Sequence, residues 1–343
     1  MSWIETKTKV VHGVQSDKIP YDEIVQAEEP VIFRGAAKHW GLVQSGLASE
    51  AEAMDYMQAF HANKKMLAFI GEPDIDGYFF YNEALTGINF KTEWLSLADF
   101  FDGVKSSFES DAAKSFFIGS STVDESFPEF RKENDILLAD EIFEKNKPIV
   151  SVWFGNRTVT PAHYDYTHNI ACNLVGKRRF TLFPPEQVAN LYPGPLEPTP
   201  GGQVVTMADL RNPDFQKFPR LNDAFAAAQV AELEPGDILY YPPMWWHQVE
   251  SLGAFNVMMN YWWNSSPLYI DTPQITLLHG ILSLRNRTVQ EKKAWKALFD
   301  YYIFDQTSEA VEHLPDHAQG DLSELNELKA RRLRAKIISR LNR

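Results

Sequence analysis

The sequence predicts a mostly β core of the sandwich or barrel type, the jelly roll among them, with added helices. Three observations support this fold class. Short β-like runs separated by turn signals fill residues 115–266, the pattern before residue 115 is mixed, and the pattern after residue 266 is helical. The chain of 343 residues is longer than one compact core needs, so we expect a catalytic domain with additions.

Residues 1–114 are expected to form an N-terminal mixed α/β extension that packs on the barrel. Val31–Phe33 is a β-like run, and 66–70 and 78–81 have strand character. Ser49 and Glu52 have the spacing of a helical capping box.

Residues 115–266 are expected to form the catalytic core. Its strand candidates are 116–118, 149–154, 170–175, 179–183, 238–241 and 257–263, and glycine- and proline-containing turns separate them. An insertion at about residues 186–230 is polar and rich in proline, and insertions of this length often carry function.

Residues 267–343 are expected to form C-terminal helices. Thr288 and Glu291 have capping-box spacing, and Asp321 or Ser323 is expected to open a last helix. Helices with an apolar face beyond a completed β core must cover either the flank of that core or a second subunit.

Composition limits the partners and the compartment. The formal net charge of −13 argues against nucleic acid or an anionic membrane surface as a partner, because phosphates require a cationic face. The single cysteine, Cys172, excludes an intrachain disulfide. No signal-like or membrane-spanning apolar stretch is evident, so we expect a cytoplasmic protein.

The segment 160–165 carries the strongest chemical signal. Residues i and i+2 of a strand project from one face, so His163 and Asp165 can present an imidazole and a carboxylate to one point. His247 follows the 238–241 strand and supplies a third ligand. Two imidazoles and one carboxylate leave three positions of an octahedral ion open, the arrangement of non-haem Fe(II) oxygenases. A His-x-Asp pair alone is a weak signal, but the β context and the distal histidine strengthen it.

His168 lies close to this segment, but strand alternation places it on the opposite face from His163 and Asp165. Two interpretations of His168 stay open at this point, a structural role and a substrate-facing role.

The ordered set of motifs resembles the JmjC-type, cupin-like (cupin_8) Fe(II)/2-oxoglutarate oxygenases. Within that family it looks closest to the asparaginyl hydroxylase that inhibits hypoxia-inducible factor. The resemblance covers about residues 150–265, and its motifs are Val159–Asp165, Asn169, Gly176, Leu182–Pro185, Leu191–Pro193, Asn212–Asp214, Pro235–Asp237, Trp245–His247 and Asn260.

The resemblance implies a double-stranded β-helix with Fe(II) at its mouth, and a reaction that consumes 2-oxoglutarate and O2. By position, Arg178 stands where the family anchors the co-substrate carboxylate, usually with lysine. Thr160 matches a supporting hydroxyl, and Asn169 and Asn260 match amides that line the co-substrate pocket. Alternatively, Arg178 belongs to the exposed basic run 177–179, and the asparagines only bond backbone.

Four positions depart from that pattern or extend it. Phe117 stands where the family has an assisting tyrosine. Gln203 aligns with one substrate-gripping residue of the asparaginyl hydroxylase, but Gly202 replaces its arginine partner, which weakens an asparagine specificity. Trp262 could pack under the pocket, but core packing is the expectation for a lone tryptophan. The C-terminal helices resemble the pair through which relatives dimerise.

Three functions compete on these observations. The first is hydroxylation of a protein or peptide side chain by Fe(II), 2-oxoglutarate and O2. The second is the same chemistry on a small molecule such as an amino acid or natural product. The third is a non-oxygenase metal-binding cupin, for which a carboxylate anchor at Arg178 and Thr160 would have no purpose.

Overall fold

The computed structural model describes residues 4–108, 113–138, 140–305 and 309–342, which divide into two compact units. The first unit comprises residues 1–265 and the second comprises 266–343. Each is described here by itself. Within the described ranges no helix combines the length and the apolar character needed to cross a bilayer.

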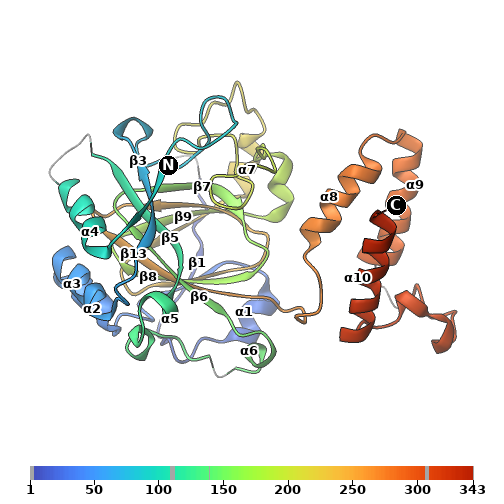
Figure 1. The fold of residues 1–343 in the computed structure, drawn as a ribbon, viewed down its shortest axis with the longest axis horizontal. Helices are drawn as coiled ribbons and strands as arrows, with labels where there is room; N and C mark the ends of the chain where they lie inside the picture. Colours follow the sequence, from blue (N-terminus) through green and yellow to red (C-terminus); the bar gives the residue numbers. More distant parts are fainter. Residues whose placement is uncertain (1–3, 109–112, 139, 306–308, 343) are drawn as a thin grey trace. The chain divides into compact units, whose positions relative to one another are not determined.

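Two β-sheets build the first unit (Figure 1). Their strands are β1 (Lys9–Val11), β2 (Val31–Phe33), β3 (Met66–Gly71), β4 (Lys91–Leu95), β5 (Ser115–Thr122), β6 (Ile149–Gly155), β7 (Val159–Tyr164), β8 (His168–Val175), β9 (Arg178–Phe183), β10 (Gln229–Leu233), β11 (Ile238–Tyr241), β12 (Trp246–Ser251) and β13 (Asn256–Trp263). The large sheet has the order β1-β2-β11-β8-β13-β6-β5-β3-β4, and the small sheet has the order β10-β9-β12-β7. All paired strands are antiparallel except β1 and β2.

This pair of antiparallel sheets confirms the predicted jelly-roll core of the cupin type, with helices N-terminal and C-terminal to it. The helices of the first unit are α1 (Tyr21–Ala27), α2 (Gly41–Ala48), α3 (Glu50–Phe60), α4 (Leu97–Ser106), α5 (Val123–Ser126), α6 (Ile142–Lys145) and α7 (Leu221–Ala227). The predicted cap at Ser49 is confirmed, since its side chain accepts a hydrogen bond from the Glu52 amide at the start of α3.

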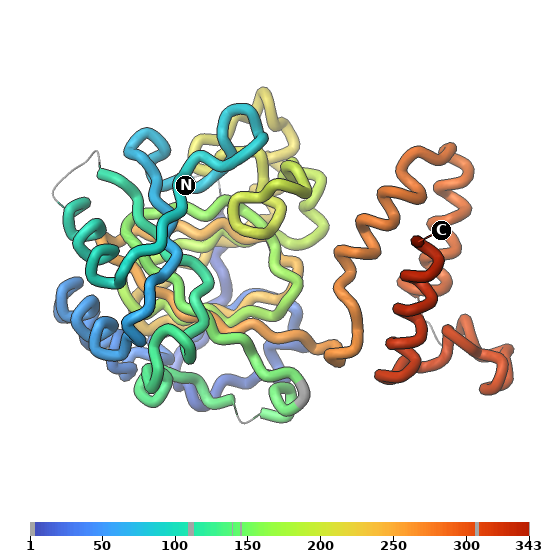
Figure 2. The backbone as a smooth tube through the Cα atoms, in the orientation of Figure 1, coloured from blue at the N-terminus to red at the C-terminus, as the bar shows by residue number. Residues whose placement is uncertain are grey.

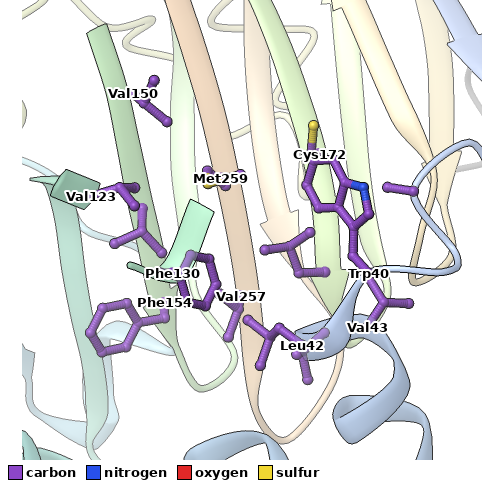
Figure 3. Packing of buried hydrophobic residues seen from close by; sticks show 14 of the residues in the cluster. Trp40, Leu42, Val43, Val123, Phe130, Val150, Phe154, Cys172, Val257 and Met259 are labelled. Carbon is purple, nitrogen blue, oxygen red and sulfur yellow. The ribbon is translucent and has the colours of Figure 1, made fainter. Parts of the chain in front are cut away.

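Strand alternation separates an apolar outer face of the large sheet from a more polar inner face. Along β13, Val257, Met259 and Tyr261 join the main core, together with Trp40 and Leu42 from the N-terminal helical region (Figure 3). The intervening residues Met258, Asn260 and Trp262 line an internal cavity. The helices α2, α4 and α5 pack on β8, β5 and β6 respectively, so they cover the outer face of the large sheet and leave its inner face to line the cavity.

Two irregular segments lie side by side near one end of the barrel (Figure 2). One joins β3 to β4, and the other is the insertion between β9 and β10. Arg211 of the insertion bonds Asp76, with 3.1 Å between Nη1 and Oδ2, and the Tyr81 hydroxyl donates to the Pro195 carbonyl at 3.3 Å. These contacts hold the two segments together.

The strand expected at 78–81 is not formed. Only isolated bridges occur at Tyr78 and Tyr81. The Asn89 side chain accepts from the Phe80 amide and donates to the Tyr78 carbonyl, at 2.8 and 2.9 Å. A side-chain amide therefore satisfies groups that a neighbouring strand would otherwise pair.

The second unit is helical, with α8 (Pro273–Leu284), α9 (Val289–Phe299) and α10 (Glu327–Leu341). The predicted capping box of Thr288 and Glu291 opens α9. The expected start of the last helix at Asp321 or Ser323 is wrong, because Asn326 caps α10 by accepting from the Lys329 amide.

Candidate metal centre

The structure brings His163, Asp165 and His247 together. Their ligand atoms all lie within 4.8 Å of one another. His163 and His247 are cross-strand partners on β7 and β12, and their ring centroids lie 4.3 Å apart. Asp165 directly follows β7, and its Oδ2 lies 3.6 Å from Nε2 of His247.

Backbone carbonyls fix which nitrogen of each histidine is free. Nδ1 of His163 lies 2.8 Å from the Pro161 carbonyl, and Nδ1 of His247 lies 3.0 Å from the Trp245 carbonyl. A carbonyl only accepts, so each Nδ1 donates its N–H there, and Nε2 is the nitrogen of each ring that remains to face a metal. Burial lowers the pKa of His247 to about 4, which keeps this imidazole neutral at ordinary pH.

A β-bulge in β7 gives the site its second polar group from that strand. The pairing shifts so that three steps along β7, from His163 to Thr160, oppose two steps along β12, from His247 to Val249. Simple alternation would put Thr160 and His163 on opposite faces, but the extra residue brings both into the cavity.

A chain of hydrogen bonds orients the carboxylate of Asp165. The Asn169 amide donates to Oδ2 of Asp165 at 3.2 Å, and the Asn260 amide donates to the Asn169 oxygen at 3.4 Å. The indole of Trp153 donates to the Asn260 oxygen at 2.8 Å. Asn169 and Asn260 thus lie in the predicted cavity, where they support the carboxylate through one another.

The metal cavity, as we call the space between the two sheets beside these ligands, has a volume of about 160 Å3. It contains every residue predicted for the site, and its lining is Phe117, Ser120, Trp153, Thr160, His163, Asp165, Asn169, Arg178, Phe180, Gly201, Gln203, Tyr241, His247, Val249, Met258, Asn260 and Trp262.

Arg178 is the cation of the metal cavity and is 3% exposed. Its Nε donates to the Asn173 oxygen at 3.3 Å, and no carboxylate among the described residues forms an ion pair with it. Burial lowers the pKa of Arg178 to about 10, so the guanidinium is still charged at neutral pH. The two neighbouring basic side chains form ion pairs outside the cavity, Lys177 with Glu234 and Arg179 with Glu232.

Sequence reasoning missed Tyr241 and misjudged Trp262. Tyr241 faces the metal cavity from β11, and its hydroxyl lies 3.5 Å from Nε2 of His247. It brings a hydroxyl to a cavity in which Phe117 has none. Alternation along β11 could have identified Tyr241, because Leu239 and Tyr241 share the inner face.

Trp262 was expected to serve packing, but it lines the cavity. Its buried indole nitrogen has no hydrogen-bond partner among the described residues.

His168 takes the structural role. Its two ring nitrogens bond the Tyr240 hydroxyl at 3.0 Å and the Ser265 hydroxyl at 2.8 Å, and its ring stacks on Trp263 at 5.1 Å between centroids. All of these contacts lie away from the metal cavity.

A second cavity of about 180 Å3 adjoins the first, and we call it the aromatic chamber. Its lining is Phe69, Phe79, Phe90, Phe117, Gly119, Ser120, Trp153, Thr160, Pro161, His163, Pro200, Gly201, Gln203 and Val205. Gly202, beside this lining, has a φ of 95°, a conformation that residues with side chains rarely adopt. An arginine at this position would be strained here.

A jelly-roll barrel with two imidazoles and one carboxylate at an inner wall defines a metal-binding cupin. Comparison with known proteins agrees. The model of the cupin-like domain family matches residues 17–269, and the chain belongs to that family.

Three relatives illustrate the relationship. The chain is 34% identical over 150 residues to JmjC domain-containing protein D of Dictyostelium discoideum, which covers 40% of this chain and 32% of the relative. It is 36% identical over 114 residues to human HSPB1-associated protein 1, with 33% and 23% covered. It is 26% identical over 239 residues to the lysine-specific demethylase JMJ30 of Arabidopsis thaliana, with 69% and 50% covered. The chain thus spans half or less of the length of these curated relatives. The narrower resemblance to the asparaginyl hydroxylase stays a prediction.

Proposed function

We propose that this chain is an Fe(II)- and 2-oxoglutarate-dependent dioxygenase that hydroxylates a C–H bond of a protein or peptide side chain. The observation that carries the proposal is the buried guanidinium of Arg178, which forms no ion pair with a described carboxylate and lies in the same cavity as the three metal ligands. A buried cation without an anionic partner is costly, and a carboxylate ligand that enters the cavity removes that cost.

The residues fit Fe(II). Two imidazole nitrogens, from His163 and His247, and the carboxylate of Asp165 would hold the ion, because this nitrogen and oxygen donor set suits iron. When bound, Fe(II) would supply O2 activation, and in the overall reaction one oxygen atom would end in the C–OH group of the product and the other in succinate, formed from 2-oxoglutarate with loss of CO2.

The protein's own residues would bind the metal and the co-substrate, orient them and exclude bulk water. Carbonyls hold both histidines in the tautomer that offers Nε2, and Asn169 holds Asp165. Arg178 can receive the distal carboxylate of 2-oxoglutarate, with the Thr160 and Tyr241 hydroxyls in the same cavity. Burial raises the pKa of Tyr241 well above its usual value, so its hydroxyl keeps the proton that it would donate.

Two other functions compete with this one. A small-molecule hydroxylase would share the metal and the anchor and differ only in the substrate. The insertion supplies Gly201 and Gln203 to both cavities, and this surface segment favours a peptide. The relative JMJ30, whose name refers to lysine, supports a side-chain substrate as well. In a non-oxygenase metal-binding cupin, the uncompensated Arg178 would have no purpose.

The test compares two adjacent arginines. Aerobic incubation of the wild type with Fe(II) and 2-oxoglutarate should yield succinate, slowly even without substrate. In Arg178→Ala the half-saturating 2-oxoglutarate concentration should rise roughly ten- to a hundredfold, because hydrogen bonds to charged groups contribute about 1.5–3 kcal/mol. The Fe(II) requirement should change little.

The matched control is Arg179→Ala, since Arg179 pairs with Glu232 and Glu250 outside the cavity. Its half-saturating concentration should equal that of the wild type. An equal rise in both variants, or a joint rise in the Fe(II) requirement, would place the anchor elsewhere. No succinate with any peptide or amino-acid panel would favour the metal-binding cupin.

We further propose that the helical unit joins two copies of the chain. Among its described residues only Ala310 and Ala330 are buried, whereas Leu268, Leu282 and Phe304 are 84%, 80% and 74% exposed. Helices with so little core of their own need an apolar partner surface.

Analytical ultracentrifugation tests the dimer. The wild type should sediment as a dimer, and Leu282→Asp should sediment as a monomer. Leu47→Asp, on exposed Leu47 of α2, is the control. A wild-type monomer would contradict the proposal.

A further inference from the structure

The aromatic chamber shares a wall with the metal cavity but has a different chemistry. Four phenylalanines and Trp153 line it, and they come from β3, β5, β6 and the segment between β3 and β4. Phe79 and Phe90 lie 5.1 Å apart between ring centroids, Phe69 and Phe90 lie 5.2 Å apart, and Phe117 stacks on Trp153 at 6.0 Å. The rings support one another and hold the space open.

The chamber reaches the metal centre directly. His163, a metal ligand, and Thr160 line both spaces, as do Phe117 and Trp153. A group held in the chamber therefore lies beside His163. Arg178 and Asp165 line only the metal cavity, so the polar side suits the co-substrate and the aromatic side remains for the substrate.

The lining of the chamber contains no aspartate, glutamate, lysine or arginine among the described residues. Its polar side chains are Ser120, Thr160, Gln203 and His163, all on the walls shared with the metal cavity. A charged amine would lose its water here without gaining a counter-ion, and a primary amide would find few partners. An apolar group would instead gain from leaving water.

The volume of the chamber limits which apolar group can fit in it. A dry apolar cavity of roughly 150 Å3 holds a benzene molecule. At about 180 Å3 the chamber matches a leucine or phenylalanine side chain.

We propose that the aromatic chamber receives an uncharged apolar side chain, leucine- or phenylalanine-like, and holds one of its C–H bonds at the metal centre. The inference rests on the proposed hydroxylase function for its chemistry, but the binding step can be tested without turnover. Phenyl rings also attract alkylated ammonium groups, so a methylated lysine is the competing occupant and the test includes it.

The experiment uses the full chain loaded with Mn(II) and two matched probes, 4-fluorotoluene and the cationic 4-fluorobenzylammonium. The fluorine signal of a probe bound beside the paramagnetic ion broadens, whereas the same probe with Zn(II)-loaded protein does not. We expect broadening of 4-fluorotoluene at concentrations at least tenfold below those needed for the cation. Equal or stronger broadening of the cation would overturn the proposal in favour of an ammonium receptor, and no broadening of either probe would also overturn it.

A pair of variants locates the probe. Phe69→Trp adds volume at the half-buried edge of the chamber and should weaken the broadening severalfold. Phe60→Trp makes the same change at a half-buried phenylalanine that packs on Tyr56 and Phe130, and should leave the broadening unchanged. Equal broadening in both variants would place the probe outside the chamber. The wild-type probe pair decides the question even if Phe69→Trp does not fold.

Turnover separates this inference from the proposed function. With Fe(II) and 2-oxoglutarate, peptides that differ only at a central leucine, phenylalanine, asparagine or trimethyllysine are compared for succinate and for a gain of one oxygen. Leucine or phenylalanine peptides should stimulate most. Succinate with preference for asparagine or trimethyllysine would refute the apolar substrate while sparing the oxygenase. Probe binding without succinate from any peptide would refute the oxygenase while sparing the chamber.

Discussion

The metal cavity and the aromatic chamber share His163, Thr160 and Phe117, and they differ in how the rest of each is held in place. In the metal cavity, each ligand is fixed by a directional hydrogen bond, such as that from Asn169 to Asp165. In the chamber, the rings are fixed by non-directional contacts with other rings. Directional contacts fail when one atom is lost, whereas apolar packing weakens in proportion to the area lost. We therefore expect abrupt effects on the polar side and graded effects on the aromatic side.

The largest effect is expected from Asp165→Ala, which removes the carboxylate of the metal centre. Fe(II) retention and succinate formation should both fall to background, because two imidazoles alone leave too weak a site. Metal content after gel filtration measures Fe(II) retention, and the thermal midpoint measures whether the fold persists. The fold should persist, since Asp165 lies after β7 and outside the apolar core.

The control for this variant is Asp102→Ala, on an exposed position of α4. It should keep both metal and activity. Unchanged iron stoichiometry in Asp165→Ala would remove this residue from the ligand set and, with it, the contrast between the two cavities.

The next effect tests how far the polar side depends on supporting bonds. Asn169→Ala removes the donor to Asp165 and should lower Fe(II) affinity by roughly 10- to 100-fold, the usual loss when a second-layer contact to a metal ligand is removed. Asn260→Ala acts one bond further away and should cost less. Calorimetric titration with Fe(II) under anaerobic conditions measures both.

Two further variants complete that comparison. Asn190→Ala loses only a bond to Gln187 and should bind Fe(II) like the wild type. Phe90→Leu, in the chamber, should also leave Fe(II) affinity unchanged, because no metal ligand contacts that ring through a directional bond. A loss in Phe90→Leu as large as in Asn169→Ala would show that the two cavities do not act separately.

The sequence predicted the polar side far better than the aromatic side. His163 and Asp165 are two residues apart, so strand periodicity alone predicted that their side chains lie on one face. The order of the motifs predicted His247 as the third ligand. The bulge that turns Thr160 inward left no signal in the sequence, because it depends on the pairing of β7 with β12.

The chamber was missed for a related reason. Phe69, Phe79, Phe90 and Phe117 are far apart in the sequence, and only the pairing of β5 with β3 and the path of the segment between β3 and β4 place them around one space. Each phenylalanine by itself is typical of core packing. The interpretation of Trp262 as a packing residue was wrong on the same grounds, since a tryptophan on an inner face cannot be distinguished from a core tryptophan without the partner strands.

The smallest effect concerns His168, which faces away from both cavities and is held by Tyr240, Ser265 and Trp263. Burial lowers its pKa to about 4, below the value near 6.5 that an unfolded chain has. Between these two pKa values the unfolded state binds a proton that the folded state does not. The contribution of His168 to stability is therefore complete above about pH 6.5 and declines as the pH falls toward about 4.

The free energy of unfolding should drop between pH 7 and pH 5 by on the order of 1 kcal/mol more in the wild type than in His168→Gln. Urea titrations at the two pH values measure this difference, with His39→Gln at an exposed position as the control. A wild-type pH dependence that His168→Gln leaves unchanged would mean that another group is responsible. Loss of Fe(II) affinity in His168→Gln would instead tie the outer face of β8 to the metal cavity, which the contacts of His168 do not support.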